Sequence, residues 1–306
     1  MSVLPLAFLF PSNLYMETTD SETNNTGNSK SAALLEQIDD SLDELAVALE
    51  GGKSDKLIAF LDTISRFHRY SFNNLMLIAM QNPDASRVAG FHAWKKLGRS
   101  VKKGEKGIAI LAPVVRRKSE PEDDESGSDE AKAEQRPLIG CKVVHVFDVS
   151  QTKGRPLPGI DEITGNPGHY FEKLRRFVSE LGIELRTEPI PGGADGVSHG
   201  GAITLRPGME EGKAFGVLSH ETAHELLHRT ARRSETTKTI RETEAEAVAF
   251  VVSKAVGLEA GSAASDYIQL YNGNRDTLQE SLSHIRECAT RILDAIMPHE
   301  PNSTTS

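Results

Sequence analysis

The sequence has few cysteines and no long apolar run, and both absences narrow the class of protein. Cys141 and Cys288 are its two cysteines, and they lie far apart with no C-x-x-C pair, so neither a disulfide framework nor a cysteine zinc site is predicted. No segment approaches the roughly 18 consecutive apolar residues of a membrane helix. The apolar run near the N-terminus lacks a preceding positive charge and a small-residue cleavage site. We therefore expect a soluble, cytoplasmic protein without a membrane partner.

The length of 306 residues is enough for two domains, each able to bury a core. We expect an α+β fold in which a small basic α+β domain at residues 31–155 precedes a mainly helical domain at 165–297. Polar composition predicts a disordered extension at 1–30, with Met16 as an alternative start, and a disordered tail at 298–306.

The net charge of −9 conceals a strongly basic segment in the first half. Residues 66–118 contain twelve Lys or Arg and two acids, whereas residues 119–134 contain eight acids and one Lys. A basic module predicts binding to a polyanion. We expect a disordered acidic insertion at 119–137, which either competes for the basic face or is simply solvated.

Apolar spacing and turn residues predict the secondary structure. Helices are expected at about 31–49, 54–67, 71–80, 91–97, 168–181, 211–228, 236–256, 263–271 and 275–297. Strands are expected at 108–115, 141–147, 183–187 and 202–205. The stretch 99–115 is predicted to form a hairpin that turns at Gly104 and Gly107.

The stretch SHETAHELLH at residues 219–228 contains the H-E-x-x-H pattern twice, in overlapping frames. Histidines four apart on a helix share a face and can both reach one zinc ion. The Glu that follows the first His lies close enough to take a proton from the metal's water. The first frame offers His220 and His224 as ligands and Glu221 as the base.

Neighbouring residues favour the first frame over the second. The first frame follows the uncharged run 215–219, as a buried catalytic helix requires. The second frame has Glu221 shortly before it and runs directly into Arg229, where the helix is expected to end. We therefore predict that Glu225 and His228 either support the site or lie at the surface.

Residues 241–252, RETEAEAVAFVV, offer a third ligand, because acids beside a buried apolar run are costly unless they are paired or bind metal. Glu242 and Glu246 are four apart and share a face, while Glu244 points elsewhere. We predict that Glu242 is the ligand and that Glu246 orients a ligand histidine through its second ring nitrogen. The reverse assignment and Glu244 stay open, as does a simple interaction of these acids with the helix dipole.

Two histidines and one glutamate leave an open coordination position, which is typical of a catalytic Zn²⁺ site. Peptide hydrolysis is the reaction expected, with Glu221 as the proton acceptor. Candidate donors to the oxyanion are His199, Tyr267 and Tyr271. We expect the strand at 202–205 to be the sheet edge that holds an extended substrate.

The basic segment has the residues that binding of single-stranded nucleic acid requires, namely cations for phosphates and planar side chains for bases. Its aromatic candidates are Tyr70, Phe72, Phe91 and Trp94, although Phe72 and Trp94 are equally compatible with the core. Asn74 is a further polar candidate. The predicted contact residues are Arg69, Tyr70, Asn73, Lys95, Lys96, Arg99, Lys102, Lys103 and Lys106.

Two parts of the chain resemble known families. HETAHELLH followed by E-x-x-A-E at 242–246 resembles the ImmA/IrrE-type metallopeptidases, which implies a zincin-like fold with a gluzincin His2Glu zinc site. YSFNNLMLIAMQ at 70–81, VAGFHAWKKLGRSVKKGEKGIAIL at 88–111 and VFDVSQTKG at 146–154 resemble the N-terminal domain of the ArdC antirestriction proteins. That resemblance implies a domain that binds single-stranded DNA, followed by a metallopeptidase-like domain.

Two hypotheses follow from these features. In the first, a zinc metallopeptidase is tethered to DNA and cleaves a DNA-bound or regulatory protein. In the second, an antirestriction protein shields DNA without proteolysis, and its zinc site is structural.

Overall fold

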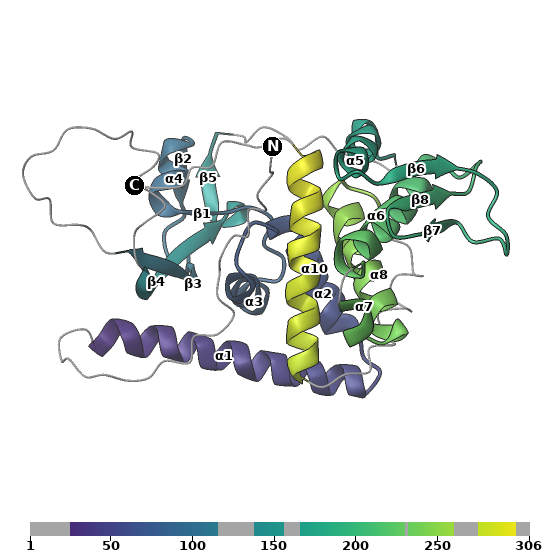
Figure 1. Ribbon diagram of the computed structural model, residues 1–306. Coiled ribbons are helices and arrows are strands. Elements are labelled where there is room, and N and C mark those ends of the chain that lie inside the picture. Colours follow the sequence, from purple (N-terminus) through teal and green to yellow (C-terminus); the bar gives the residue numbers. More distant parts are fainter. Residues whose placement is uncertain (1–24, 116–137, 156–165, 230–231, 260–274, 298–306) are drawn as a thin grey trace, which may run out of the picture.

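The computed structural model describes residues 25–115, 138–155, 166–229, 232–259 and 275–297, and its fold is mixed α+β (Figure 1). The predicted acidic insertion 119–137, the helix at 263–271, Tyr267, Tyr271 and the tail 298–306 lie outside the described residues. Among the described residues, no helix combines the length and the apolar character needed to cross a membrane.

Four helices and two small sheets make up the described part of the first half of the chain. The helices are α1 (Asn25–Glu50), α2 (Asp55–Phe67), α3 (Phe72–Gln81) and the short α4 (Phe91–Lys96). The strands are β1 (Val88–Gly90), β2 (Arg99–Val101), β3 (Ile108–Val115), β4 (Leu138–Asp148) and β5 (Thr152–Gly154), with the 3-10 turn η2 (Val149–Gln151) before β5. The strand orders are β1-β4-β3 and β2-β5.

The predicted hairpin at 99–115 is wrong. Strand β2 pairs with β5, with Arg99 opposite Gly154, while β3 pairs antiparallel with β4. Residues 102–107 therefore connect two different sheets. The reason is tertiary: Gly154 approaches the backbone of Gly98 so closely that a Cβ there would lie 2.4 Å from the Gly98 oxygen, and this contact favours β5 as the partner of β2.

Helix α1 begins at Asn25, inside the extension 1–30 for which disorder was predicted. Ser31 is buried, and its Oγ donates a hydrogen bond to the carbonyl oxygen of Cys141 on β4 at 3.1 Å. This contact anchors the first turns of α1 to a strand far away in the sequence, which the polar composition alone did not indicate.

The second half contains a three-stranded sheet and the helices that carry the predicted metal ligands. Its elements are α5 (His169–Glu180), β6 (Glu184–Thr187), β7 (Gly196–Ser198), β8 (Ala202–Leu205), α6 (Glu211–Leu227), α7 (Arg232–Glu235), α8 (Lys238–Ala255) and α10 (Arg275–Ile296). The sheet order is β6-β8-β7, with β6 parallel and β7 antiparallel to β8.

The prediction that residues 202–205 form the sheet edge is wrong. This strand, β8, is central, because β6 and β7 occupy its two sides. Its residues Ile203 and Leu205 are buried, as expected of a strand covered by helices. The edge strand beside α6 is β7. This short strand lies within the glycine-rich stretch 192–201, whose composition favours a turn.

The two halves pack against each other through their helices. Helix α2 contacts α8, and α10 contacts both α1 and α8, with α10 lying centrally in Figure 1. The Thr290 hydroxyl donates a hydrogen bond to the His68 carbonyl at 2.8 Å, and Arg275 pairs with Asp39 at 2.6 Å. The buried core thus runs from the basic half into the helices that carry the candidate metal ligands.

Candidate metal centre

Helices α6 and α8 bring the first H-E-x-x-H frame and the acidic stretch together. The two helices pack against each other, and Thr237 caps the start of α8 by accepting a hydrogen bond from the Ile240 backbone. Ala223 of α6 and Ala245 of α8, which are next to predicted ligands in the sequence, are both fully buried. The first two turns of α8 therefore face the last two turns of α6.

His220, His224 and Glu242 form a cluster of potential metal ligands, with their ligand atoms within 4.8 Å of one another. The two Nε2 atoms lie 3.1 Å apart. Oε2 of Glu242 lies 3.6 Å from each of them. Tetrahedral zinc with bonds of about 2.0–2.1 Å separates its ligand atoms by about 3.3–3.5 Å, so the three side chains fit this metal.

The hydrogen bonds behind His220 fix which of its nitrogens faces the cluster. Its Nδ1 lies 3.1 Å from Oε2 of Glu246, so in the neutral ring Nδ1 carries the hydrogen and donates it to that carboxylate. The lone pair of Nε2 then points toward His224 and Glu242. Glu246 thus occupies the orienting position that the sequence predicted for it.

A second chain of hydrogen bonds fixes His224. Nε2 of His228 lies 2.8 Å from Glu244, which accepts its hydrogen, and Nδ1 of His228 lies 3.0 Å from Nδ1 of His224. His224 must therefore donate from Nδ1, which leaves its Nε2 lone pair toward the cluster. Two lone pairs and one carboxylate converge, an arrangement that a bound cation stabilises.

The local pKa values also show that the cluster attracts positive charge. Burial opposes the charged form of His220, but Glu242, Glu246 and Glu221 outweigh burial and raise the pKa of His220 to about 9. Hydrogen bonds to His220 and His224 hold the pKa of the Glu242 carboxyl far below its usual range. A metal ion that replaces the proton of His220 would meet the same favourable field.

Glu221 is buried beside the cluster, with its carboxylate toward strand β7. A Cβ built on Gly196 would lie 3.0 Å from Oε1 of Glu221, so a larger residue at 196 would displace this side chain. Burial raises the pKa of Glu221, while His220 and His224 oppose that rise. A carboxylate with a raised pKa is better suited to take up a proton near neutral pH.

The second frame has a structural role in the described residues. His228 is buried, with 1% of its surface exposed, and Glu225 is buried on the other face, where it contacts the turn after β7. Neither lies at the surface, which had been one of the two expectations for them. Glu244 faces His228, Arg232 and Ser281 rather than the ligand cluster.

His199, a candidate oxyanion donor, is exposed in the turn between β7 and β8. Its backbone NH donates to Ala202, while no described contact of its side chain reaches the cluster. Its role stays a prediction.

Several predicted DNA contacts gather on α4 and β2. Lys95 and Lys96 are exposed in the last turn of α4. The loop after β2 contains three further exposed lysines, Lys102, Lys103 and Lys106. Pairing of β2 with β5 adds Lys153 and Arg155, two exposed cations that the sequence analysis missed. Lys153 lies in the VFDVSQTKG stretch that resembles ArdC, which is the signal that could have identified it, whereas Arg155 lies just beyond that stretch.

Other predicted contact residues have partners within the protein. The Arg99 side chain donates to Thr152, and Arg69 pairs with Asp294 of α10 at 3.0 Å. Tyr70 packs edge-on against Phe67 and is half-buried, as is Asn73. Each stays a predicted contact, because an internal partner does not prevent a side chain from also meeting a phosphate.

Three candidates belong to the core instead. Trp94 is buried and donates its indole NH to the Phe147 carbonyl at 2.8 Å. Phe72 packs edge-on against Phe60. Asn74, expected to contact DNA, is buried and bridges to β3 by accepting from the Leu111 NH and donating to its carbonyl.

Phe91 remains as the exposed aromatic of the basic region, with 52% of its surface accessible. It begins α4 and lies one turn before Lys95 on the same face. An exposed ring beside cations is the combination that base stacking requires.

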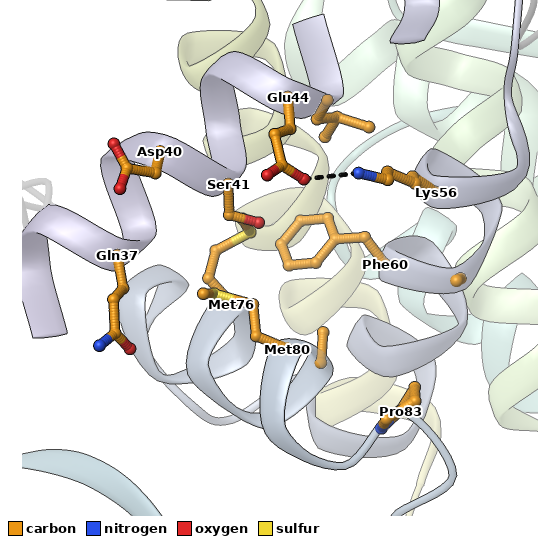
Figure 2. Close-up of a pocket in the computed structure, with 12 residues that line it drawn as sticks. Gln37, Asp40, Ser41, Glu44, Lys56, Phe60, Met76, Met80 and Pro83 are labelled. Atoms are coloured by element: carbon orange, nitrogen blue, oxygen red, sulfur yellow. Dashed lines mark hydrogen bonds and ion pairs between the residues drawn. The ribbon is translucent and has the colours of Figure 1, made fainter.

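A groove of about 480 Å³ lies between α1, α2 and α3 (Figure 2). Phe60, Met76 and Met80 form its apolar floor, and Glu44 pairs with Lys56 at its rim. None of the predicted metal or DNA contact residues lines it.

Comparison with known proteins shows that part of the first half of the chain matches a family model. Fold and site together define an α+β protein with a histidine and carboxylate cluster between two helices. Residues 31–147 match the family of N-terminal domains of anti-restriction factor ArdC. The resemblance of this part of the chain to the ArdC N-terminal domain is thus confirmed, whereas the ImmA/IrrE resemblance stays a prediction.

Solved structures of the antirestriction protein ArdC from plasmid R388 are similar in fold. The metal-free crystal structure is 18% identical, with a TM-score of 0.50, and the match covers 83% of this chain and 96% of that one. The Mn(II)-bound structure is 16% identical, with a TM-score of 0.49, covering 86% and 99%.

A curated relative is an uncharacterized protein of Bacillus anthracis, 24% identical over 283 residues. The match covers 79% of this chain but 48% of the relative, so this chain spans about half the length of that protein.

Proposed function

We propose that this protein is a zinc metallopeptidase associated with DNA. Its first half binds single-stranded DNA, and its second half hydrolyses peptide bonds in a DNA-bound or regulatory protein. The convergence of His220, His224 and Glu242, with Glu221 beside them, is the observation that carries the proposal. Two neutral ring nitrogens and one carboxylate match a zinc site that keeps an open position for water or substrate.

When bound, zinc would acidify a water molecule and polarise the carbonyl group of the substrate. Glu221 would serve as the general base, which takes up a proton from water and returns it to the leaving amine. Glu246 keeps Nδ1 of His220 protonated, and His228 does the same for Nδ1 of His224, so that both rings present a lone pair. Burial of Glu221 supports its role as base, because burial raises its pKa toward the working pH.

The DNA-binding part of the proposal is supported by the cations of α4, β2 and β5 and by the exposed Phe91 ring. Cations alone bind any nucleic acid, whereas bases can stack on a side chain only where they are not stacked in a duplex. The match of residues 31–147 to an anti-restriction factor domain supports an interaction with DNA in the cell.

A second candidate function is a DNA shield without proteolysis, and the same family match favours it. In that case the metal cluster ties α6 to α8 and stabilises the fold. The buried contacts of Glu244 with His228, Arg232 and Ser281 support this alternative, because they are polar contacts that tie α8 to its neighbours without a metal.

Two measurements distinguish the two functions: the metal content of the protein, and its proteolysis of labelled casein. Each is made with and without single-stranded DNA. We would compare the wild type with Glu221→Gln and with a control, Glu211→Gln, at an exposed position in the first turn of α6. The peptidase proposal expects bound zinc in all three proteins and lost cleavage in Glu221→Gln alone. A zinc-loaded wild type that cleaves nothing but protects DNA from restriction would support the shield.

A further inference from the structure

Glu225 holds the turn between β7 and β8 through three hydrogen bonds. One carboxylate oxygen accepts from the Ser198 hydroxyl at 2.6 Å and from the Gly200 NH at 2.7 Å. The other accepts from the Gly201 NH at 2.8 Å. The Glu225 side chain is fully buried, with a relative exposure of 0%, and Nη1 of Arg229 lies 3.8 Å from its Oε2. Loss of these contacts would leave a buried carboxylate poorly satisfied.

The turn needs this acceptor because of its backbone shape. Gly200 and Gly201 have φ values of 73° and 118°, in the region that favours glycine. Their consecutive NH groups point to one side and form a concave site for an anion. The carboxylate of Glu225 fills that site from α6, one helical turn after Glu221.

The outer edge of β7 faces the helix that carries Glu221. The His199 NH donates to Ala202, and the Arg206 NH donates to Asp195, so residues 195 and 199 pair with β8. In an antiparallel ladder the pairing alternates, and the backbone groups of Gly196 and Ser198 therefore point away from β8. The Ser198 NH contacts the Glu221 carboxylate on that side.

Glu221 and Glu225 therefore touch the same short strand from successive turns of α6. Gly196 lies so close to the helix that a Cβ there would be 2.5 Å from Cγ1 of Val217. A shift of the β7–β8 turn would change the position of the edge relative to Glu221. In an edge strand, free backbone groups are the part that can pair with an extended peptide, and on β7 these are the outward groups of Gly196 and the Ser198 carbonyl, since Glu221 occupies the Ser198 NH.

We propose that Glu225 is a positioning residue, which fixes the outer edge of β7 against Glu221 and thereby aligns the backbone of an extended peptide substrate. The peptide substrate in this inference rests on the proposed peptidase function. The hydrogen bonds between Glu225 and the β7–β8 turn do not depend on that function. The two H-E-x-x-H frames then have separate tasks. The first supplies ligands and base, and the second supplies the residue that places the substrate-binding edge.

The test compares wild type, Glu225→Gln, Ser198→Ala and the exposed control Glu211→Gln, all loaded with zinc. Hydrogen exchange of the segment 196–203 reports the hold on the turn directly. Glutamine keeps the size of the side chain but turns an NH2 group toward backbone NH groups, so exchange should rise about tenfold or more. Ser198→Ala removes one donor and leaves the carboxylate, so a smaller rise is expected, and this milder variant covers the case in which Glu225→Gln fails to fold.

Steady-state cleavage of labelled casein and zinc content complete the experiment. Positioning predicts that Glu225→Gln raises KM several-fold, with kcat within about twofold of wild type and zinc content unchanged. Unchanged exchange at 196–203 in Glu225→Gln would overturn the inference, as would a loss of kcat with constant KM. If the wild type cleaves no casein while exchange rises in Glu225→Gln, the peptidase function fails and the hold on the turn stands.

Discussion

Nδ1 of His224 lies 3.0 Å from Nδ1 of His228, although both side chains belong to the same helix. One of the two nitrogens must donate, and the 2.8 Å contact between His228 and Glu244 shows that it is His224. We predict that His228→Leu lowers zinc affinity about 10–100-fold, because His224 loses the acceptor that orients its ring. Competition with a chromogenic chelator measures this change.

His199→Ala is the matched control, since it removes an exposed histidine near the same sheet. The Leu variant should still fold, because Glu244 keeps Arg232 and Ser281 as partners. Equal zinc affinity in His228→Leu and wild type would show that His224 does not depend on this chain of contacts.

The three glutamates of α8 should differ sharply in their effects on zinc. Glu242→Gln is expected to lower zinc affinity most, since it removes a ligand, and Glu246→Gln to lower it about 10–100-fold through His220. Glu244→Gln should instead lower the free energy of unfolding, because the buried Arg232 contact weakens. The reverse order of Glu242 and Glu246 in zinc titrations would exchange their roles.

How far the sequence predicts the site depends on how local each relationship is. Helical spacing is local, so it correctly separated the direction of Glu244 from that of Glu242 and Glu246. The burial of His228 was not predictable from spacing, because its partner Glu244 belongs to another helix. Likewise, no local pattern shows that Glu225 meets the NH groups of Gly200 and Gly201.

In the fold, too, local contacts were predictable from the sequence and long-range contacts were not. Ser71 caps α3 by accepting from the Asn74 NH, as the local sequence indicates. The register of β2 is set instead by Gly154, more than fifty residues away, whose missing side chain lets the two backbones meet. A glycine turn at 104 favoured a hairpin locally, and a long-range contact overrode it.

Asp148 gives a pH-dependent prediction for the stability of the β4–β5 connection. Its carboxylate accepts from the backbone NH groups of Ser86, Arg87 and Ser150. Burial raises the pKa of Asp148, but these hydrogen bonds outweigh burial and hold it below its usual value. A lowered folded pKa means that the stabilisation is complete above the unfolded value and is lost as the pH falls through the folded pKa.

Asp148→Asn should therefore lower the free energy of unfolding by about 1–3 kcal/mol at neutral pH, because one NH group loses its acceptor. Urea titrations should show a constant difference from wild type above about pH 5, and a difference that narrows as the pH falls below the lowered pKa. A difference that does not depend on pH would exclude the charge of Asp148 as the cause.

The loop after β2 is expected to contact phosphates. Lys102 donates to the Ser150 carbonyl at 2.7 Å, which holds its side chain over η2, and Lys103 is exposed beside it. Lys102→Ala/Lys103→Ala should weaken DNA binding and lower the salt slope by about 0.7 per lost contact on a single strand. The control Lys53→Ala/Lys254→Ala makes the same change in charge at exposed positions on other elements. Equal slopes for the two double variants would remove the loop from the DNA site.

Phe91 provides the test of preference for single strands. Its ring is 52% exposed and meets the His92 ring edge-on at 5.7 Å, which leaves a face of the phenyl group accessible to a base. Phe91→Ala should cost about 1–3 kcal/mol in binding to a single strand, because one stacked base is lost, and little in binding to a duplex. Leu97→Ala is the matched control, since Leu97 is similarly exposed at 48% but has no ring. Fluorescence anisotropy with a labelled single strand and with its duplex measures the two affinities. Equal losses of single-strand affinity in Phe91→Ala and Leu97→Ala would indicate general apolar contact rather than base stacking.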